Sequence, residues 1–185
     1  MQTTTVKLYT LPYSNVRTYL AVSLFVLGNL AMPQLFHLIP QGGMVWLPIY
    51  FFTLVGAYKY GWMVGLLTAV LSPMANSVLF GMPIMAVLPA ILLKSVLLAV
   101  SAGYAASHFR KASLGQLIGV VLTYQFIGTL GEWAMKGDFW LAIQDFRIGI
   151  PGMLLQVFGG WIFINKILNK VVCIIRKSKC SRVSK

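Results

Sequence analysis

Residues 60–109 form a stretch of fifty residues in which Lys94 is the only lysine, arginine or acidic side chain. Placing a lysine at the centre of a bilayer costs about 2.5–3.5 kcal/mol on insertion scales. Lys94 lies within the apolar run Ile84–Ser107, so we expect it to face a protein interior or a watery pocket. The polar segment Ser72–Pro83 before it is punctuated by proline and glycine. A charge behind such a loop, at a membrane boundary, indicates a solute-binding site.

The composition indicates an integral membrane protein, because 58% of residues are hydrophobic, 10% are charged and the mean hydropathy is +0.81. The apolar runs are long and continuous rather than alternating, which favours helices over a barrel. A chain of 185 residues has room for one small bundle. We predict a single all-α polytopic domain over residues 1–172 and a basic cytoplasmic tail over 173–185.

Six membrane spans can be drawn. The second and third are short, because Pro48 and the pair Ser72-Pro73 bend or end them, so part of each is expected to be broken or re-entrant. The six spans are Arg17–Phe36, Val45–Tyr58, Gly61–Leu71, Pro89–Ser107, Leu114–Met135 and Ile148–Val172.

The basic residues set the orientation. Of the 15 lysines and arginines, all except Lys94, Lys136 and Arg147 lie on one side of the membrane. They lie up to the start of the first span, in the loop from span two to span three, in the loop from span four to span five, or from Lys166 to the end of the chain. The positive-inside rule therefore predicts that both termini are cytoplasmic. The outer loops are expected at His37–Gly43, Met74–Met82 and Lys136–Phe146.

Several function classes lack a signature in the sequence. Basic residues in short segments between spans indicate topology rather than a nucleic-acid groove. His37 and His108 are expected on opposite sides of the membrane, so they cannot share a metal. No phosphate-binding loop, nucleophile elbow or metalloprotease motif is present. We predict neither enzymatic activity nor a cofactor, and no disulfide between Cys173 and Cys180, which lie in or beside the tail.

Polar side chains in the fifth and sixth spans are candidates for solute contacts. Gln125, Thr129 and Glu132 are spaced by four and three residues, which places them on one face of a helix. Trp133 flanks this face, and Gln156 is an amide among the small residues of the sixth span. Each has a structural alternative, namely interhelical hydrogen bonding for the polar groups and an interfacial anchor for the tryptophan. Asn76, in the outer loop between the third and fourth spans, fits a solute contact and a turn residue equally well.

Three motifs in order resemble a known family. They are Ser72-Pro-x-x-Asn-x-x-Leu-Phe-Gly-Met-Pro83, Leu88-Pro89 at the start of the fourth span, and Ile150-Pro-Gly-x-x-x-Gln156 at the start of the sixth. The chain resembles the substrate-binding S components of energy-coupling-factor (ECF) transporters over about Gly42–Lys170. The position of Lys94 is acidic in many members of that family, and this chain departs from them there.

The resemblance implies a prokaryotic cell (inner) membrane protein that captures a vitamin-like solute in its outer half. It implies partnership with a transmembrane coupling subunit and two cytoplasmic ATPase subunits, and a toppling motion that delivers the solute inside. The family's first helix often carries Ala-x-x-x-Ala for coupling, whereas this chain has Ala21, Gly28 and Ala31. We expect those three residues to form the coupling surface.

Two questions stay open at the level of sequence. Lys94 either binds a carboxylate or phosphate on the solute, with Asn76, Gln125 and Gln156 as neutral partners, or forms a structural pair with Glu132. The protein is either a carrier subunit or a structural or assembly membrane subunit that transports nothing. A flat or heterocyclic solute with an anionic group is favoured, and pantothenate-, lipoate- and folate-like solutes all fit.

Overall fold

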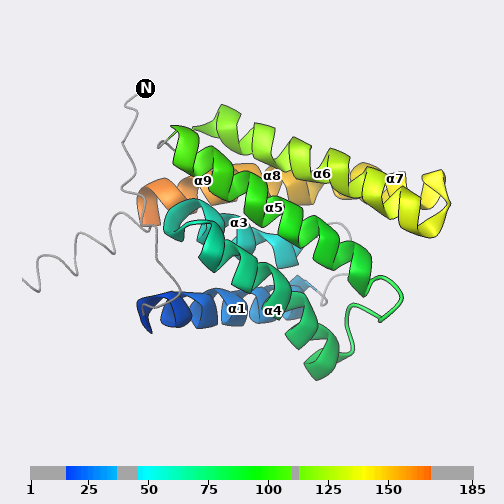
Figure 1. Ribbon diagram of the computed structural model, residues 1–185, viewed down its shortest axis with the longest axis horizontal. Helices are drawn as coiled ribbons and strands as arrows, with labels where there is room; N and C mark the ends of the chain where they lie inside the picture. The colour runs from blue at the N-terminus through cyan, green and yellow to red at the C-terminus, as the bar shows by residue number, and fades with distance from the viewer. Residues whose placement is uncertain (1–15, 37–45, 110–112, 168–185) are drawn as a thin grey trace, which may run out of the picture.

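The computed structural model describes residues 16–36, 46–109 and 113–167, and this part of the chain is almost entirely helical (Figure 1). The cytoplasmic tail predicted over 173–185, with Cys173 and Cys180, lies outside the described residues. The elements are α1 (Val16–Phe36), the 3-10 turn η1 (Pro48–Tyr50), α3 (Phe51–Tyr60), α4 (Trp62–Phe80), α5 (Leu88–Phe109), α6 (Leu114–Lys136), α7 (Phe139–Ile148), α8 (Ile150–Leu154), the π-helical turn η2 (Leu155–Gly159), α9 (Gly160–Ile162) and the π-helical turn η3 (Phe163–Ile167).

Four helices, α1, α4, α5 and α6, are long and apolar enough to cross a membrane. A fifth span is possible if the bent pair Ala142–Ile148 and Ile150–Lys166 counts as one. The all-helical prediction and the prediction of a multi-pass membrane protein are therefore confirmed. The count of six spans is not, because the segment drawn as the second span forms only η1 and the ten-residue α3.

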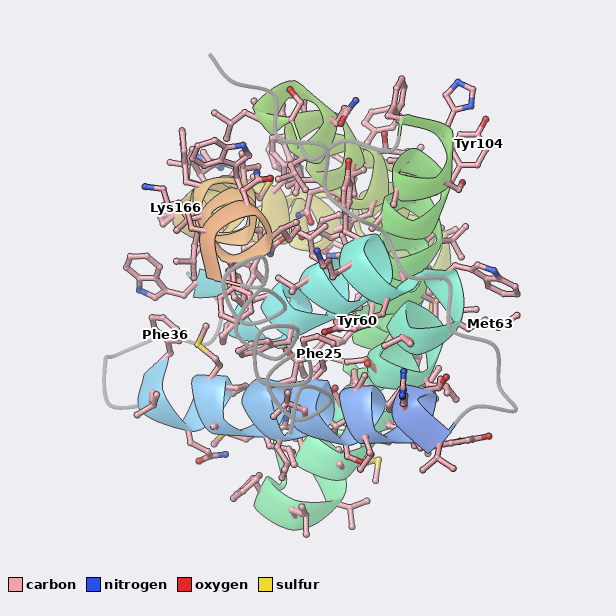
Figure 2. The ribbon with its side chains drawn as sticks, turned by 90° about the vertical axis from the view of Figure 1, so that its left-hand side faces the viewer. Phe25, Phe36, Tyr60, Met63, Tyr104 and Lys166 are labelled. Carbon is pink, nitrogen blue, oxygen red and sulfur yellow. The ribbon has the colours of Figure 1, made fainter. Side chains whose placement is uncertain are left out.

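The short helix α3 lies at the centre of the bundle, between α1 on one side and α5 with α6 on the other (Figure 1). Leu54, Val55 and Ala57 of α3 are fully buried. Phe25 of α1 points toward Tyr60 at the end of α3, and their ring centroids are 5.6 Å apart (Figure 2). Most side chains of α3 are buried and apolar, and Thr53 and Lys59 are polar exceptions among the buried ones. A helix buried on most of its faces is largely apolar, which explains why the sequence of α3 resembles a membrane span although the helix is too short to be one.

Close approaches at glycine fix how α3, α4 and α5 pack. Gly61 has a φ of 98° and makes the sharp turn between α3 and α4. A Cβ on Gly65 would lie 2.4 Å from the Cβ of Ala57, and one on Gly103 would lie 2.5 Å from the Cβ of Trp62. The start of α4 therefore touches the end of α3 and the late part of α5, so α5 runs antiparallel to α4.

The third span is not short, and that prediction is wrong. Helix α4 continues through Pro73 to Phe80 over 19 residues, so most of the outer loop expected at Met74–Met82 is helix. Proline removes one backbone hydrogen bond from a helix interior, but neighbouring helices can hold the chain in place. Here Ser72, Pro73 and Asn76 are all buried, and packing against α1 and α5 outweighs the lost bond.

The outer loop expected at Lys136–Phe146 also contains a helix. α7 begins at Phe139 and packs against α6. The chain then bends by 62° between Ile148 and Ile150 before it re-enters the bundle. The sequence predicted the fourth and fifth spans correctly, because α5 and α6 match them to within two residues at each end.

A buried asparagine of α1 joins three elements. Asn29 Nδ2 donates to Thr53 Oγ1 of α3 and to Ser72 Oγ of α4, both at 3.1 Å. Its Oδ1 accepts from the backbone N–H of Phe52 at 3.2 Å. That N–H belongs to the first turn of α3, where no helical carbonyl is available. Asn29 therefore caps α3 from a neighbouring helix and orients it within the bundle.

We predict that Asn29→Leu lowers the free energy of unfolding by about 2 kcal/mol, because it leaves the Phe52 N–H unpaired and removes two side-chain hydrogen bonds. The measurement is detergent-denaturant unfolding of the purified protein. Ser23→Leu, an exposed position on the same helix, is the matched control and should change stability little. Equal losses from both variants would show that Asn29 has no special role.

Candidate functional site

Lys94 forms a buried ion pair with Glu132. Lys94 lies in the second turn of α5, following Pro89 in the first turn, where the missing N–H of proline is harmless. Its Nζ lies 2.5 Å from Glu132 Oε2 near the end of α6, and Lys94 is 1% exposed. The structure thus brings these two residues together, as the structural alternative for Lys94 required.

A second lysine shares the same carboxylate. Lys136 Nζ lies 2.6 Å from Glu132 Oε1 one helical turn away, and its side chain is 30% exposed. Each carboxylate oxygen therefore accepts from a different ammonium. Two positive charges and one negative charge give this cluster, Lys94–Glu132–Lys136, a net charge of +1, with Lys136 at its solvent-facing side.

Glycine on α6 makes room for the lysine. A Cβ on Gly128 would lie 2.6 Å from Lys94 Cγ, and one on Gly131 would lie 2.5 Å from Leu93 Cδ2. Gly128 lies one turn before Glu132, so the aliphatic part of Lys94 runs along α6 over this glycine toward the carboxylate. The absent side chain at Gly128 is what allows α5 and α6 to pack closely at this point.

Two buried glutamines extend the same side of the bundle. Gln125, 1% exposed, lies on α6 two turns before Glu132, and Gln156 is fully buried in η2. The Tyr124 hydroxyl donates to Gln156 Oε1 at 2.9 Å and so connects α6 to η2. Neither side-chain polar atom of Gln125 has a hydrogen-bond partner among the described residues, nor does Gln156 Nε2.

The other two candidates lie elsewhere. Asn76 of α4 donates to the Asn29 carbonyl oxygen at 3.0 Å and belongs to the polar group around Asn29. Trp133 is 45% exposed and packs edge-on against Phe139 of α7, with ring centroids 5.6 Å apart. Of the six candidates, the structure therefore gathers Lys94, Glu132, Gln125 and Gln156 along α6 and leaves Asn76 and Trp133 outside this group.

The three residues expected at the coupling surface do not share one exposed face. A Cβ on Gly28 would lie 2.7 Å from the Phe52 ring, so this glycine serves packing between α1 and α3. Ala21 packs against the core. Ala31 is exposed, and it is the residue of the three that an approaching helix can reach.

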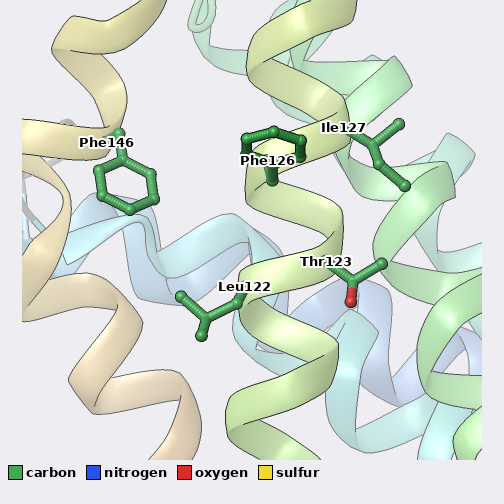
Figure 3. Close-up of a pocket in the computed structure, with 5 residues that line it drawn as sticks. All are labelled: Leu122, Thr123, Phe126, Ile127 and Phe146. Atoms are coloured by element: carbon green, nitrogen blue, oxygen red, sulfur yellow. The ribbon is translucent and has the colours of Figure 1, made fainter.

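An open apolar groove of about 460 Å³ lies between α6 and α7 (Figure 3). Its lining residues are Leu122, Thr123, Phe126 and Ile127 of α6 and Phe146 of α7. The Thr123 hydroxyl donates to the Gly119 carbonyl at 2.7 Å, which leaves the groove without a polar group to orient a solute. None of the six candidate residues lines it, and an outward apolar groove in a spanning protein suits lipid chains.

Sequence reasoning missed Tyr124, Gly128, Lys136 and Asn29. Gly128 and Lys136 carry a detectable signal, since each lies four residues from Glu132 on the same helix face. Asn29 stands out as an amide in the middle of an apolar helix, which needs a partner in a membrane. The bond between Tyr124 and Gln156 joins residues 32 positions apart, and no local pattern predicts it.

No protein-family model, curated protein or solved structure matches this chain. Over residues 16–36, 46–109 and 113–167, no group of three or more histidine, cysteine or acidic side chains is placed to hold a metal ion.

We predict that Gly128→Ala lowers the free energy of unfolding by about 1–2 kcal/mol, because the new methyl group displaces the stem of Lys94 and weakens its pair with Glu132. Gly119→Ala on the same helix is the control, since a Cβ there meets nothing within 4 Å. Alanine favours helix over glycine, so that variant should be as stable as the wild type or more so. Unfolding curves that show no loss for Gly128→Ala would refute the packing role of this glycine.

Proposed function

We propose that this protein is the substrate-binding membrane subunit of an ECF-type importer of vitamins or similar micronutrients. It captures a small solute outside the cell and delivers it with a transmembrane coupling subunit and two ATPase subunits. It is not itself an enzyme in this proposal, since ATP hydrolysis belongs to the partners. The three motifs around Pro73, Pro89 and Pro151 support the family assignment, and the distribution of polar groups in the bundle supports a binding role.

The observation that carries the proposal is the crowding of buried polar groups toward one end of the bundle. The end of α1, the start of α3, the end of α4, the start of α5 and the end of α6 meet at this end, as the contacts of Asn29 and Lys94 show. Most of the buried polar and charged side chains lie there, and they include Asn29, Thr53, Ser72, Asn76, Ser77, Lys94, Ser95, Gln125, Glu132 and Gln156. A purely structural bundle would have little use for so many polar groups on one side of its midplane.

The charges favour the outer side for this end. Glu132, Asp138, Lys94, Lys136 and Arg147 belong to it. Arg17, Lys59 and Lys166 belong to the opposite end, and in the sequence Arg110 and Lys111 join the ends of α5 and α6 there. Under the positive-inside rule the end with more basic residues is cytoplasmic. Both termini are then cytoplasmic, and the polar end faces the outside.

The net positive cluster Lys94–Glu132–Lys136 supports an anionic group on the solute. Glu132 already neutralises one ammonium, and Lys136 is partly exposed. An incoming carboxylate or phosphate would meet Lys136 first and then add to the pair, rather than replace Glu132. In this arrangement Lys94 serves both structure and binding.

The alternative is a structural or assembly subunit that transports nothing. The closed pair between Lys94 and Glu132 favours it, because a satisfied ion pair needs no ligand. Gln125 argues against it, since a buried amide with no partner has no value in a scaffold.

Purification of the full-length protein from its own membranes tests the proposal. We expect one coupling subunit and two ATPase subunits to be retained, and a small molecule to be released on denaturation and seen by native mass spectrometry. Ala31→Trp, on the exposed face of α1, should lose the ATPase subunits and keep the small molecule, whereas the exposed control Ser23→Trp should keep both. An intact protein that retains neither ATPase subunits nor solute would favour the structural alternative.

A further inference from the structure

We infer that the contact between α6 and η2 binds a neutral group that both donates and accepts hydrogen bonds, such as the lactam or imide edge of a heterocycle. This inference rests on the proposed function and narrows the class of solute. It concerns the buried amides of Gln125 and Gln156 and the hydroxyl of Thr129, which we call the amide site.

The polar atoms of the amide site are buried and unpartnered. Gln125 Nε2 and Oε1, Thr129 Oγ1 and Gln156 Nε2 have no hydrogen-bond partner among the described residues. Thr129 lies one turn from Gln125 on α6, and α6 packs directly on η2, which carries Gln156. Native proteins rarely leave buried polar atoms unpaired, and such atoms need a specific explanation.

Several comparable side chains in the same bundle are satisfied. Asn29 uses both ends of its amide. The hydroxyls of Thr68 and Thr123 donate to the carbonyls four residues earlier, at 2.8 and 2.7 Å. Thr129 is in the same helical setting as Thr123 and makes no such bond. Among the described residues, four of the six unpartnered buried side-chain atoms belong to the amide site, and the other two are Asn76 Oδ1 on α4 and Ser95 Oγ on α5.

The backbone at Gln156 is itself unusual. η2 is a π-helical turn between α8 and α9, and such turns occur frequently at functional sites. The Tyr124 hydroxyl donates to Gln156 Oε1, which fixes the orientation of this amide. Its Nε2 is then the atom left to donate to a ligand.

The donors and acceptors of the amide site select the chemistry of the ligand. Gln156 Nε2 and Gln125 Nε2 can only donate, and Gln125 Oε1 can only accept. A carboxylate or phosphate accepts only, so it would leave Gln125 Oε1 unpaired. An ammonium donates only, so it would leave both Nε2 groups unpaired. A lactam or imide presents an N–H beside a C=O and can pair with both kinds of atom.

The test uses uracil, hypoxanthine and lumazine as probes, each of which has a lactam edge, with 1,3-dimethyluracil as the analogue whose N–H groups are blocked. Thermal unfolding of the purified full-length protein in detergent is followed with and without each probe. The variants are Gln125→Met and Gln156→Met, which keep side-chain length and remove the amide. Gln144→Met, at an exposed position on α7, is the matched control.

We expect at least one lactam probe to raise the melting temperature of the wild type and of Gln144→Met, and 1,3-dimethyluracil to raise neither. Affinity for the active probe should fall about tenfold in each of the other two variants. Without a probe, Gln125→Met should unfold at the same temperature as the wild type or higher, because an unpaired amide has been replaced by an apolar group.

The inference is overturned if no lactam probe raises the melting temperature of the wild type. It is also overturned if 1,3-dimethyluracil raises that temperature as much as uracil does, and this comparison needs no variant. A marked loss of stability in Gln125→Met without probe would also overturn it, because the amide would then be satisfied by structural water. A tightly retained solute without a lactam or amide edge would refute the amide site and leave the importer proposal intact. Lactam binding by a protein that never retains ATPase subunits would refute the importer proposal and leave the amide site intact.

Discussion

A charged amine inside an apolar bundle has to be neutralised where it lies, and in this protein that requirement sets how α5 and α6 meet. The pair between Lys94 and Glu132 forms only if the two helices are close enough for the lysine stem to cross α6. Gly128 provides the space for the stem, and Gly131 does the same for the neighbouring Leu93. An ion pair removed from water gains little net stability, but either charge left alone would be far worse. The pair therefore acts as a constraint on helix register.

The buried polar groups at this end of the bundle divide into satisfied and unsatisfied sets. The cluster around Asn29 joins α1, α3 and α4 and leaves the Asn29 amide fully bonded, although Asn76 Oδ1 beside it has no hydrogen-bond partner among the described residues. The amide site, on α6 and η2, keeps unpartnered atoms beside the closed ion pair. A largely satisfied frame next to unsatisfied groups is what a binding site needs, because the frame positions groups whose partners arrive with the ligand.

The sequence predicted the parts of this structure that depend on local hydrophobicity. The helices α5 and α6 are long apolar runs between breaks, and the spacing of Gln125 and Glu132 placed them on one buried face. Prediction failed where packing overrides local preference. Pro73 continues a helix because its neighbours hold it there. The second span was expected to be short and bent or ended at Pro48, and α3 is indeed short and follows the turn η1 at Pro48.

The candidate site was predictable to a similar extent. A lone lysine in an apolar stretch identified Lys94, and its pairing with Glu132 stood as an alternative at the sequence level. The link from Tyr124 to Gln156 depends on the 62° bend that returns the chain to the bundle. A bend at a single glycine between two helical segments is a tertiary feature, and the local pattern at Gly149 does not distinguish it from a continuing helix.

The coupling free energy between Lys94 and Glu132 tests the central claim most directly. A double-mutant cycle with Lys94→Met, Glu132→Gln and the double variant, measured by unfolding in detergent, separates the pair from other effects of each substitution. We predict that the double variant is more stable than the sum of the single losses implies, with a coupling of about 2 kcal/mol. Glu132→Gln leaves the buried Lys94 without a carboxylate, and Lys94→Met leaves Glu132 with Lys136 as its remaining partner. Strictly additive losses would contradict the claim that this ion pair sets the packing of α5 and α6.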